Sequence, residues 1–250
     1  MTPSSSKVPV RKALVLAAGN GDRFVNGSRE SKLLQPVLGE PLILRTLRSA
    51  VEAGIAHFHV VLGYRADTLR ALLEARPPSG ATIDFSFNPD WHLENGVSAL
   101  AARTHLADGP FALLMGDHLF EADALARLLR VPLSPMESAL AIDTRPAPPG
   151  IADEATKVRT EGSRIVAIGK SLDDFDALDT GMFVCSPTLF DALEQSRAEG
   201  DTTLSGGVRL LASERLVFGV PVGDADWYDI DTMADLQIAE SRLQALPEHA

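Results

Sequence analysis

Four predicted strands in the first half of the chain alternate with amphipathic helical patterns, and this alternation limits the folds open to the sequence. The strands cover residues 12–17, 57–63, 82–88 and 111–115, and the helical stripes cover 41–53, 66–75, 97–106 and 121–129. The runs at 12–17 and 111–115 are continuously apolar, as in central strands of a sheet that is covered on both faces. The order of elements predicts an α/β fold with a mainly parallel sheet and helices on both sides.

The pattern changes after about Pro146. Hairpin-like strands at 157–160 and 164–168 flank the turn residues EGS, and later strands cover 182–186 and 215–222. Helical patterns cover 187–197, 204–212 and 233–246. We interpret this half as an α+β extension of the same sheet, within one domain of residues 11–246. The PAPPG stretch at 146–150 marks the boundary between the halves 11–145 and 146–246, and residues 1–10 are expected to form a flexible tail.

Net charge, cysteine content and apolar runs indicate which partners the protein binds and in which cellular compartment it resides. The net charge is −11 and is spread along the chain, which disfavours nucleic acid because phosphate backbones need clustered Lys and Arg. The single cysteine, Cys185, lies in the apolar run MFVC, so we expect a buried thiol and no disulfide framework. No apolar stretch approaches the ~20 residues that span a bilayer, and the chain start lacks a signal-peptide core. These features predict a cytoplasmic protein that is not embedded in a membrane.

The first predicted strand runs into a glycine-rich loop, LAAGNGDRF at 16–24. Glycines suit positions where the backbone takes a positive φ or where a ligand touches the main chain, and backbone N–H groups there can face an anion. The Gly-Lys-Ser/Thr of a P-loop is absent, and so is the third glycine of a Rossmann fingerprint. Arg23 stands near that point and Lys32 follows. Either the loop binds a polyphosphate, or it is a tight turn with a solvated arginine.

The pattern L-A-A-G-x-G-x-R-F…K…P resembles the signature of the nucleotidyltransferases, or NTP-sugar pyrophosphorylases. The resemblance implies a three-layer α/β/α sandwich around a mixed, mainly parallel sheet. It also implies that Arg23 and Lys32 are catalytic and hold the triphosphate of an NTP. The nucleotide-binding positions it suggests in the loop are Leu16, Ala17, Ala18, Gly19, Asn20 and Gly21.

Acidic residues supply candidate ligands for Mg²⁺, which prefers carboxylate oxygens and keeps several waters. Asp117 ends the apolar run FALLMG, at the edge where open α/β sheets bind ligands. Asp229 and Asp231 alternate in WYDIDT, so both project to one face. Helix capping is the alternative role for Asp117, and either Asp231 or Thr232 could cap the last helix. The family places its second metal ligand just before the last helix, and we favour Asp229 with Asp231 close behind.

Five further segments resemble the L-myo-inositol-1-phosphate cytidylyltransferases over about Lys12 to Leu243. They are NPDWHLENGVSAL at 88–100, LLMGDH at 113–118, DEATKV at 153–158, RIVAIGKSL at 164–172 and LDTGMFVCSP at 178–187. Familiar members are often fused to a membrane-embedded transferase, whereas this chain stops at Ala250. We therefore expect a soluble CDP-product that is handed to a membrane transferase. The sequence leaves a homodimer open.

The same resemblance suggests site residues in three groups. Nucleotide and base contacts fall on Asn88, Asn95, Gly96 and Ser98; acceptor-phosphate contacts on Lys157 and Lys170; polyol contacts on Asp179, Thr180 and Gly181. His118 follows the metal-binding Asp117 and is assigned to substrate binding, with a structural role as the alternative. Each of the others also has a structural alternative, as a turn, a helix cap or a solvated lysine.

The reaction implied is transfer of CMP from CTP to L-myo-inositol-1-phosphate, assisted by Mg²⁺. The acceptor phosphate attacks the α-phosphorus in line, and pyrophosphate leaves. One rival is an enzyme of the same fold that uses another NTP or another acceptor, such as a sugar-1-phosphate, a different cyclitol phosphate, phosphocholine or a phosphonate. A second rival is a catalytically inactive nucleotide-binding regulatory domain, which should have lost Arg23, Lys32 or one of the aspartates. A Rossmann oxidoreductase is disfavoured by the missing glycine.

Overall fold

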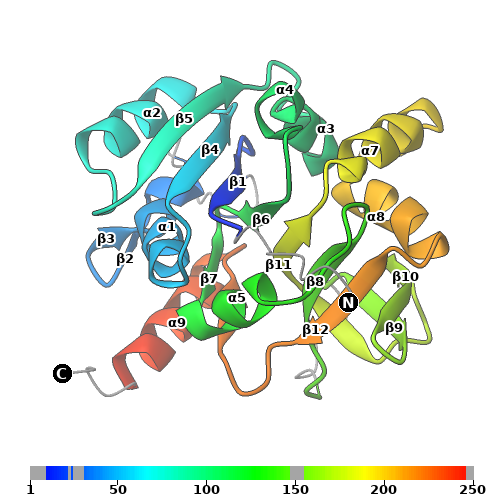
Figure 1. The fold of residues 1–250 in the computed structure, drawn as a ribbon. Coiled ribbons are helices and arrows are strands. Elements are labelled where there is room, and N and C mark those ends of the chain that lie inside the picture. The colour runs from blue at the N-terminus through cyan, green and yellow to red at the C-terminus, as the bar shows by residue number, and fades with distance from the viewer. Residues whose placement is uncertain (1–9, 22–23, 25–30, 147–154, 246–250) are drawn as a thin grey trace, which may run out of the picture.

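A nine-stranded mixed sheet forms the centre of the computed structural model, which describes residues 10–21, 24, 31–146 and 155–245. The strand order is β5-β4-β1-β6-β11-β8-β12-β10-β9 (Figure 1). The bounds are β1 Lys12–Ala17, β4 His57–Leu62, β5 Thr82–Phe87, β6 Phe111–Met115, β8 Ser138–Asp143, β9 Lys157–Glu161, β10 Arg164–Gly169, β11 Ala177–Cys185 and β12 Val217–Pro221.

Strand direction divides the sheet into a parallel half and a mixed half. β5, β4, β1 and β6 are parallel neighbours. β11 is antiparallel to β6 and β8, β8 and β12 are parallel, and β10 is antiparallel to β12 and β9. Of the nine strands, β10 and β11 thus oppose the rest, which confirms the mixed, mainly parallel sheet. β9 also pairs with β11, so the second half curls back on itself.

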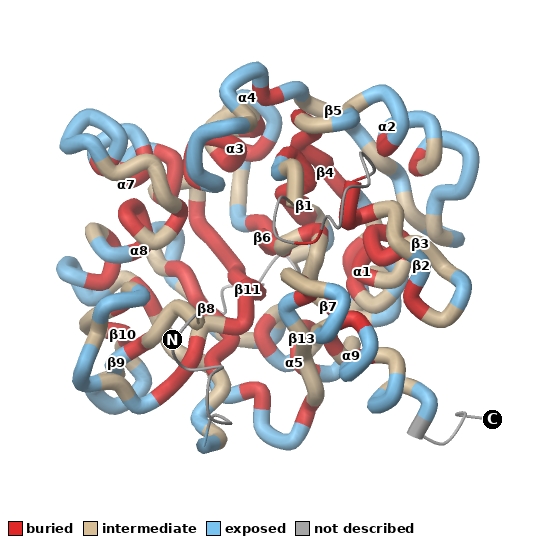
Figure 2. Tube along the Cα trace, turned by 180° about the vertical axis from the view of Figure 1, so that it is seen from behind, coloured by how far each residue is buried: buried red, intermediate tan, exposed pale blue. Residues whose placement is uncertain are grey.

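Helices cover both faces of this sheet, because alternate strand residues point to opposite sides. Ala13 and Val15 belong to a core with α1 (Leu42–Glu52), α2 (Ala66–Ala75) and α5 (Ala122–Leu129). Leu14 and Leu16 belong to a second core with α3 (Asn95–Leu100), α4 (Arg103–Leu106), α7 (Thr188–Ala198) and α8 (Leu204–Ser213). Figure 2 shows the buried strands as a red band through the middle of the molecule. The three-layer α/β/α sandwich is confirmed.

Short elements surround the parallel half of the sheet. These elements are η2 (Lys32–Leu34), β2 (Pro36–Val37), β3 (Glu40–Pro41), β7 (His118–Phe120), β13 (Trp227–Asp229) and α9 (Met233–Ala245). A third, smaller core joins β2, β7 and α9, and Val37, Leu119, Ile230 and Leu236 pack together in it. β7 and β13 form a separate two-stranded ribbon, with Asp229 opposite His118.

Three of the longer elements differ markedly from the sequence expectation, and the short η2, β2, β3 and β7 were not predicted. The helix predicted at 97–106 is broken, because the fully buried Ala102 takes φ −99° and ψ 0° between α3 and α4. β11 begins at Ala177 instead of Met182, since a bulge between Asp179 and Phe183 lets the strand continue past Gly181. β8 was not predicted, although its segment SALAID is an apolar run of the same kind as β6.

Some expectations fall outside the described residues. These are the tail up to residue 9, most of the PAPPG boundary, Arg23 and the last residues of the chain. Cys185 is buried as expected, and burial raises the pKa of its thiol. Within the described part of the chain, no helix has the length and apolar character needed to cross a membrane.

Candidate active site

The candidate site lies where β1 and β6 end side by side. The N–H of Gly116 donates to the carbonyl of Leu16 at 2.9 Å. A Cβ on Gly116 would lie 2.9 Å from that same carbonyl oxygen, so the close approach requires glycine. Asp117 comes next in the chain, in the turn between β6 and β7. This geometry brings its carboxylate beside the glycine-rich loop after β1.

Lys32 joins two of the predicted acidic residues. Its Nζ lies 2.8 Å from Oδ2 of Asp117 and 2.7 Å from Oδ1 of Asp231, and its side chain is only 10% exposed. Burial by itself lowers the pKa of this ammonium, but Asp117 and Asp231 outweigh burial and raise the pKa above its usual value. The lysine is therefore a fixed positive charge between two carboxylates that lie far apart in sequence.

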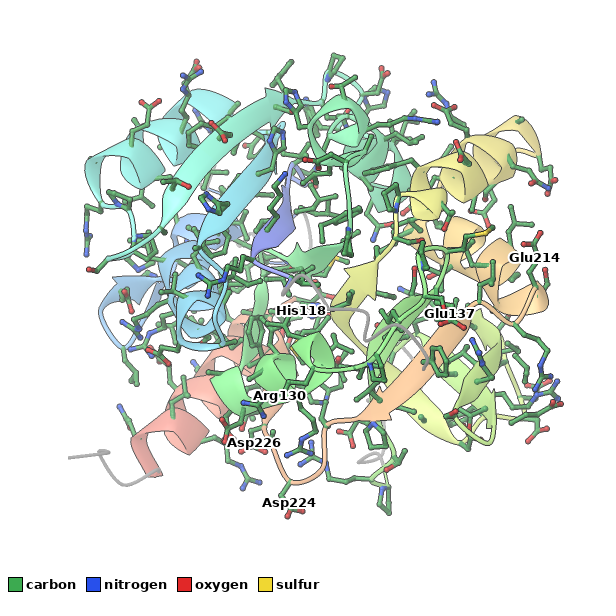
Figure 3. The ribbon with its side chains drawn as sticks, in the orientation of Figure 1. His118, Arg130, Glu137, Glu214, Asp224 and Asp226 are labelled. Atoms are coloured by element: carbon green, nitrogen blue, oxygen red, sulfur yellow. The ribbon has the colours of Figure 1, made fainter. Side chains whose placement is uncertain are left out.

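His118 forms the other side of the same acidic group. Its Nε2 lies 3.3 Å from Oδ1 of Asp229 and 3.8 Å from Oδ1 of Asp117. Its Nδ1 lies 2.9 Å from the Thr180 carbonyl, which accepts, so Nδ1 carries the proton and Nε2 faces the carboxylates. Burial lowers the pKa of the ring, and Asp229 and Asp117 more than offset this, raising the pKa to about 9. The ring lies near the centre of the molecule (Figure 3).

The predicted polyol segment holds that ring in place. Gly181 takes φ +75°, and a Cβ there would collide with His118 Nδ1 and Cε1. Thr180 is fully buried and its hydroxyl donates to the Ala141 carbonyl at 2.8 Å. Asp179 Oδ1 accepts from the Gly181 N–H at 2.8 Å, and burial raises the pKa of Asp179 to about 6. The bulge in β11 therefore presents this segment to the acidic cluster.

The described residues contain one group that could hold a metal ion, and it consists of predicted site residues. One ligand atom each from Asp117, His118 and Asp229 lies within 4.8 Å of the others. Two carboxylates fit a hard divalent cation such as Mg²⁺, and an imidazole nitrogen also suits Mn²⁺ or other transition metals. Asp231 is engaged by Lys32 instead. The donor chemistry fits a divalent cation.

The glycine-rich loop packs against Lys32. Gly21 takes φ +66°, and a Cβ there would lie 3.1 Å from Cβ of Lys32, so both the backbone and the space favour glycine. A Cβ on Gly19 would meet nothing within 4 Å. Leu16, Ala17 and Ala18 are buried along β1 and its end, while Asn20 is partly exposed. Space over Gly19 is compatible with a ligand against the backbone.

The predicted base-binding residues have partners inside the protein. The side-chain nitrogen of Asn88 donates to Ser98 Oγ at 3.0 Å, and both residues are buried. Asn95 Oδ1 accepts from the N–H of Leu204, the first residue of α8, at 2.8 Å. A Cβ on Gly96 would lie 2.6 Å from the Thr202 carbonyl. Asn88 and Ser98 therefore tie the end of β5 to α3, and Asn95 and Gly96 fasten α3 to the start of α8. The contact of these residues with a base stays a prediction.

The two predicted acceptor lysines lie on the curled second half. Lys157 begins β9, pairs with Gly169 and places its ammonium 5.4 Å from the centre of the Phe175 ring. Lys170 is exposed directly after β10. Their role stays a prediction, and Arg23 lies outside the described residues.

Thr232, one of the two predicted N-cap candidates, caps α9: the Asp235 N–H lies 3.2 Å from its hydroxyl, and the Thr232 N–H donates to Asp235 at 2.7 Å. Capping therefore does not occupy Asp231.

One feature of the site was missed at the sequence level. Asp143 ends β8 and accepts a hydrogen bond at 2.9 Å from Trp227 Nε1. An apolar run that ends in an aspartate also marked Asp117, so the same signal was present at SALAID.

Residues 13–213 match the family model described as "MobA-like NTP transferase domain". The chain belongs to this family. It is thus a nucleotidyltransferase domain, and the nucleotidyltransferase assignment made from the motifs is confirmed.

Two named relatives are similar to this chain over most of its length. The chain is 36% identical to a "Bifunctional IPC transferase and DIPP synthase" of Rubrobacter xylanophilus, over 91% of this chain and 51% of that protein. It is 28% identical to a "CMP-5'-(3-aminopropyl)phosphonate synthase" of Streptomyces rubellomurinus, over 94% of this chain and 39% of that one. The chain spans about half the length of the first of these relatives.

A solved structure extends this similarity to the whole fold. The structure of the inositol-1-phosphate CTP transferase from T. maritima superposes with a TM-score of 0.83 and 26% identity. The match covers 98% of this chain and 99% of that one. The resemblance to inositol-phosphate cytidylyltransferases, drawn from five short motifs, is confirmed.

Proposed function

We propose that this chain transfers CMP from CTP to a phosphorylated polyol, with L-myo-inositol-1-phosphate as the acceptor, giving CDP-inositol and pyrophosphate. One observation carries the proposal: Lys32 Nζ lies within 2.8 Å of both Asp117 and Asp231, with Asp229 and His118 beside them. This group stands at the end of β6 next to the glycine-rich loop. The similarity to the inositol-1-phosphate CTP transferase from T. maritima supports the choice of acceptor.

The residues act by positioning two anions and offsetting charge. An oxygen of the acceptor phosphate forms a bond to the α-phosphorus of CTP, while the bond from that phosphorus to the bridging oxygen breaks and pyrophosphate departs. A phosphate monoester is already nucleophilic near neutral pH, so no side chain has to remove a proton. Lys32, with its raised pKa, keeps its positive charge for the triphosphate at any physiological pH. Arg23 is proposed as a second cation in the loop.

A divalent cation, proposed as Mg²⁺, would be held by Asp117 and Asp229 with His118 beside them. When bound, such an ion polarises the phosphoryl oxygens and offsets their charge. Thr180 fixes His118 through its carbonyl, so Nε2 stays directed at the two carboxylates. Asp231 keeps Lys32 in place from the other side.

The test is pyrophosphate release across a grid of four NTPs and several phosphorylated acceptors, with Mg²⁺. We expect turnover with CTP and L-myo-inositol-1-phosphate, and its loss in Lys32→Gln. Lys12→Gln is the matched control, because Lys12 sits at the opposite end of β1, where it pairs with Asp108 on the surface. Equal activity of the two variants would remove Lys32 from the site. Absence of turnover with every acceptor, together with thermal stabilisation by CTP, would favour an inactive nucleotide-binding domain.

A second candidate keeps the mechanism and changes the acceptor. The similarity to a phosphonate-handling CMP transferase favours a phosphonate as the alternative nucleophile. A phosphonate presents the same oxygens on a carbon-linked phosphorus, so the charge requirement at Lys32 is unchanged. With a phosphonate added to the grid of acceptors, turnover with CTP and the phosphonate but not with inositol phosphate would select this candidate. The cytoplasmic location and a homodimer stay predictions.

A further inference from the structure

The β7–β13 ribbon, which carries His118 and Asp229, is too short to hold its own position. Each strand has three residues and the ribbon is separate from the nine-stranded sheet. Isolated two-stranded ribbons are marginally stable in water. The position of the Asp229 carboxylate, 3.3 Å from His118 Nε2, therefore depends on contacts between the ribbon and the rest of the protein.

Trp227 provides one link between the ribbon and the main sheet. It stands two residues before Asp229, so the two side chains share one face of β13. The centre of its indole ring lies 6.2 Å from the centre of the His118 ring. The indole also packs against the core that contains residues of α1 and α5. Its Nε1–H donates to Asp143 Oδ2 at 2.9 Å. Asp143 ends β8, where it pairs with Leu178 of β11, so the indole is bound to the interior of the sheet.

Arg145 closes the network from the other side. Its Nη2 donates to Asp143 Oδ2 at 2.8 Å, and its N–H and Nε both donate to Oδ1 at 2.9 Å. The same guanidinium reaches the carbonyls of Asp224 and Ala225 at 3.4 and 3.2 Å. Those residues lie in the loop that runs from β12 toward β13, in which Asp224 and Asp226 are labelled (Figure 3). The Asp143 side chain is only 12% exposed.

We propose that Asp143 is a positioning residue for the metal site: through Trp227 and Arg145 it fixes β13 so that the Asp229 carboxylate faces Asp117 and His118. The proposal rests on the proposed function, since it assumes that these three side chains bind a cation. Asp143 itself touches neither substrate nor metal. Such outer partners typically change metal affinity by roughly 10–100-fold when they are removed.

The test measures Mn²⁺ binding from the free Mn²⁺ signal in electron paramagnetic resonance, with CTP present and no acceptor, against a CTP-only sample because the triphosphate itself binds Mn²⁺. We expect Asp143→Ala and Trp227→Phe each to weaken Mn²⁺ binding about tenfold or more. Asp143→Asn keeps an oxygen that accepts from the indole, so it should lie between Asp143→Ala and the parent protein. With the acceptor and saturating metal, kcat should fall while KM for CTP stays within about twofold, as for loss of an interaction that acts in the transition state. The control is Asp191→Asn, because Asp191 also pairs with an arginine but its side chain is 72% exposed.

The double variant decides whether the two residues act as one unit. If Asp143 acts through the indole, Asp143→Ala combined with Trp227→Phe should weaken Mn²⁺ binding by less than the product of the single effects. Fully multiplicative effects, or Mn²⁺ binding like the parent in the single variants, would overturn the proposal. If Asp143→Ala fails to fold, Asp143→Asn and Trp227→Phe carry the same test. Absence of Mn²⁺ binding in the parent would also overturn it. Normal Mn²⁺ binding without CMP transfer would instead contradict the proposed function alone.

Discussion

Gly181 lies directly against the imidazole ring of His118, so that a single methyl group on Gly181 would occupy the space of ring atoms Nδ1 and Cε1. The Thr180 carbonyl accepts a hydrogen bond from Nδ1 of the same ring and so fixes the orientation of the ring. The bulge in β11 and the acidic cluster are therefore one structural unit, although 62 residues separate Thr180 from His118. Any side chain larger than that of glycine at position 181 would therefore have to displace the His118 ring.

Gly181→Ala should displace His118 and reduce kcat by about 100-fold, the effect expected for a displacement near 1 Å at a reacting centre. Its backbone strain should also cost about 1–2 kcal/mol, because alanine disfavours a positive φ. Gly80→Ala is the matched control: Gly80 has φ +81° but open space around its Cβ position. Steady-state kinetics and thermal unfolding of both variants separate the two effects. A similar loss of activity in Gly80→Ala would mean that strain, and not the ring, is responsible.

Asp229 and Asp231 should respond differently to amide substitution. Asp229 faces His118 and belongs to the group that could hold a metal, whereas Asp231 pairs with Lys32. We expect Asp229→Asn to raise the half-saturating Mg²⁺ concentration by more than about tenfold, in line with the loss of a direct metal contact. Asp231→Asn should mainly raise KM for CTP, because it frees Lys32 to move. Titrating activity against Mg²⁺ and then against CTP tests this, and the opposite ranking would make Asp231 the ligand.

Acid should reveal the contribution of Asp143 to stability. Burial raises the pKa of this carboxyl, but hydrogen bonds from Arg145 and Trp227 outweigh burial and lower the pKa below its usual value. A carboxyl whose pKa is lower in the folded than in the unfolded state stabilises the fold above the unfolded pKa, near 3.9, and loses that contribution as pH falls through the folded pKa. Urea unfolding of the parent and of Asp143→Asn should differ most near pH 7 and converge below about pH 4. A constant difference across that range would contradict the assignment.

The sequence predicted the parts of the fold whose pattern is local. β1, β6 and α2 have the predicted bounds, because a buried strand or an amphipathic helix is marked by its own residues. The glycine-rich loop and the three acidic residues were found because their motifs resemble those of the nucleotidyltransferases and lie at the ends of predicted strands. The pairing of Lys32 with Asp231 spans 199 residues and requires the segment just before α9 to lie beside η2, which no local pattern records. The role of Asp143 was missed for the same reason: its partner Trp227 is 84 residues away.

Asn95 offers the clearest test of a residue with two candidate roles. Its Oδ1 accepts from the N–H of Leu204 at the start of α8, which is a structural contact, whereas the family resemblance predicts that it also reads the base. Asn95→Ala loses both and should destabilise the fold by about 1 kcal/mol. Asn95→Asp keeps the acceptor and loses the amide donor, so its thermal stability should match the parent.

These two variants separate the roles through KM for CTP. If the amide donates to the pyrimidine, Asn95→Asp should raise KM for CTP by about tenfold, because a hydrogen bond contributes about 1 kcal/mol net and about 1.4 kcal/mol is a tenfold change. Ser205→Ala is the control, because Ser205 follows Leu204, the residue that donates to Asn95, in the first turn of α8. An unchanged KM in Asn95→Asp would assign Asn95 to the α3–α8 contact alone. Because the Leu204 contact holds α3 in place, Asn95 would then affect the base only through the position of Ser98.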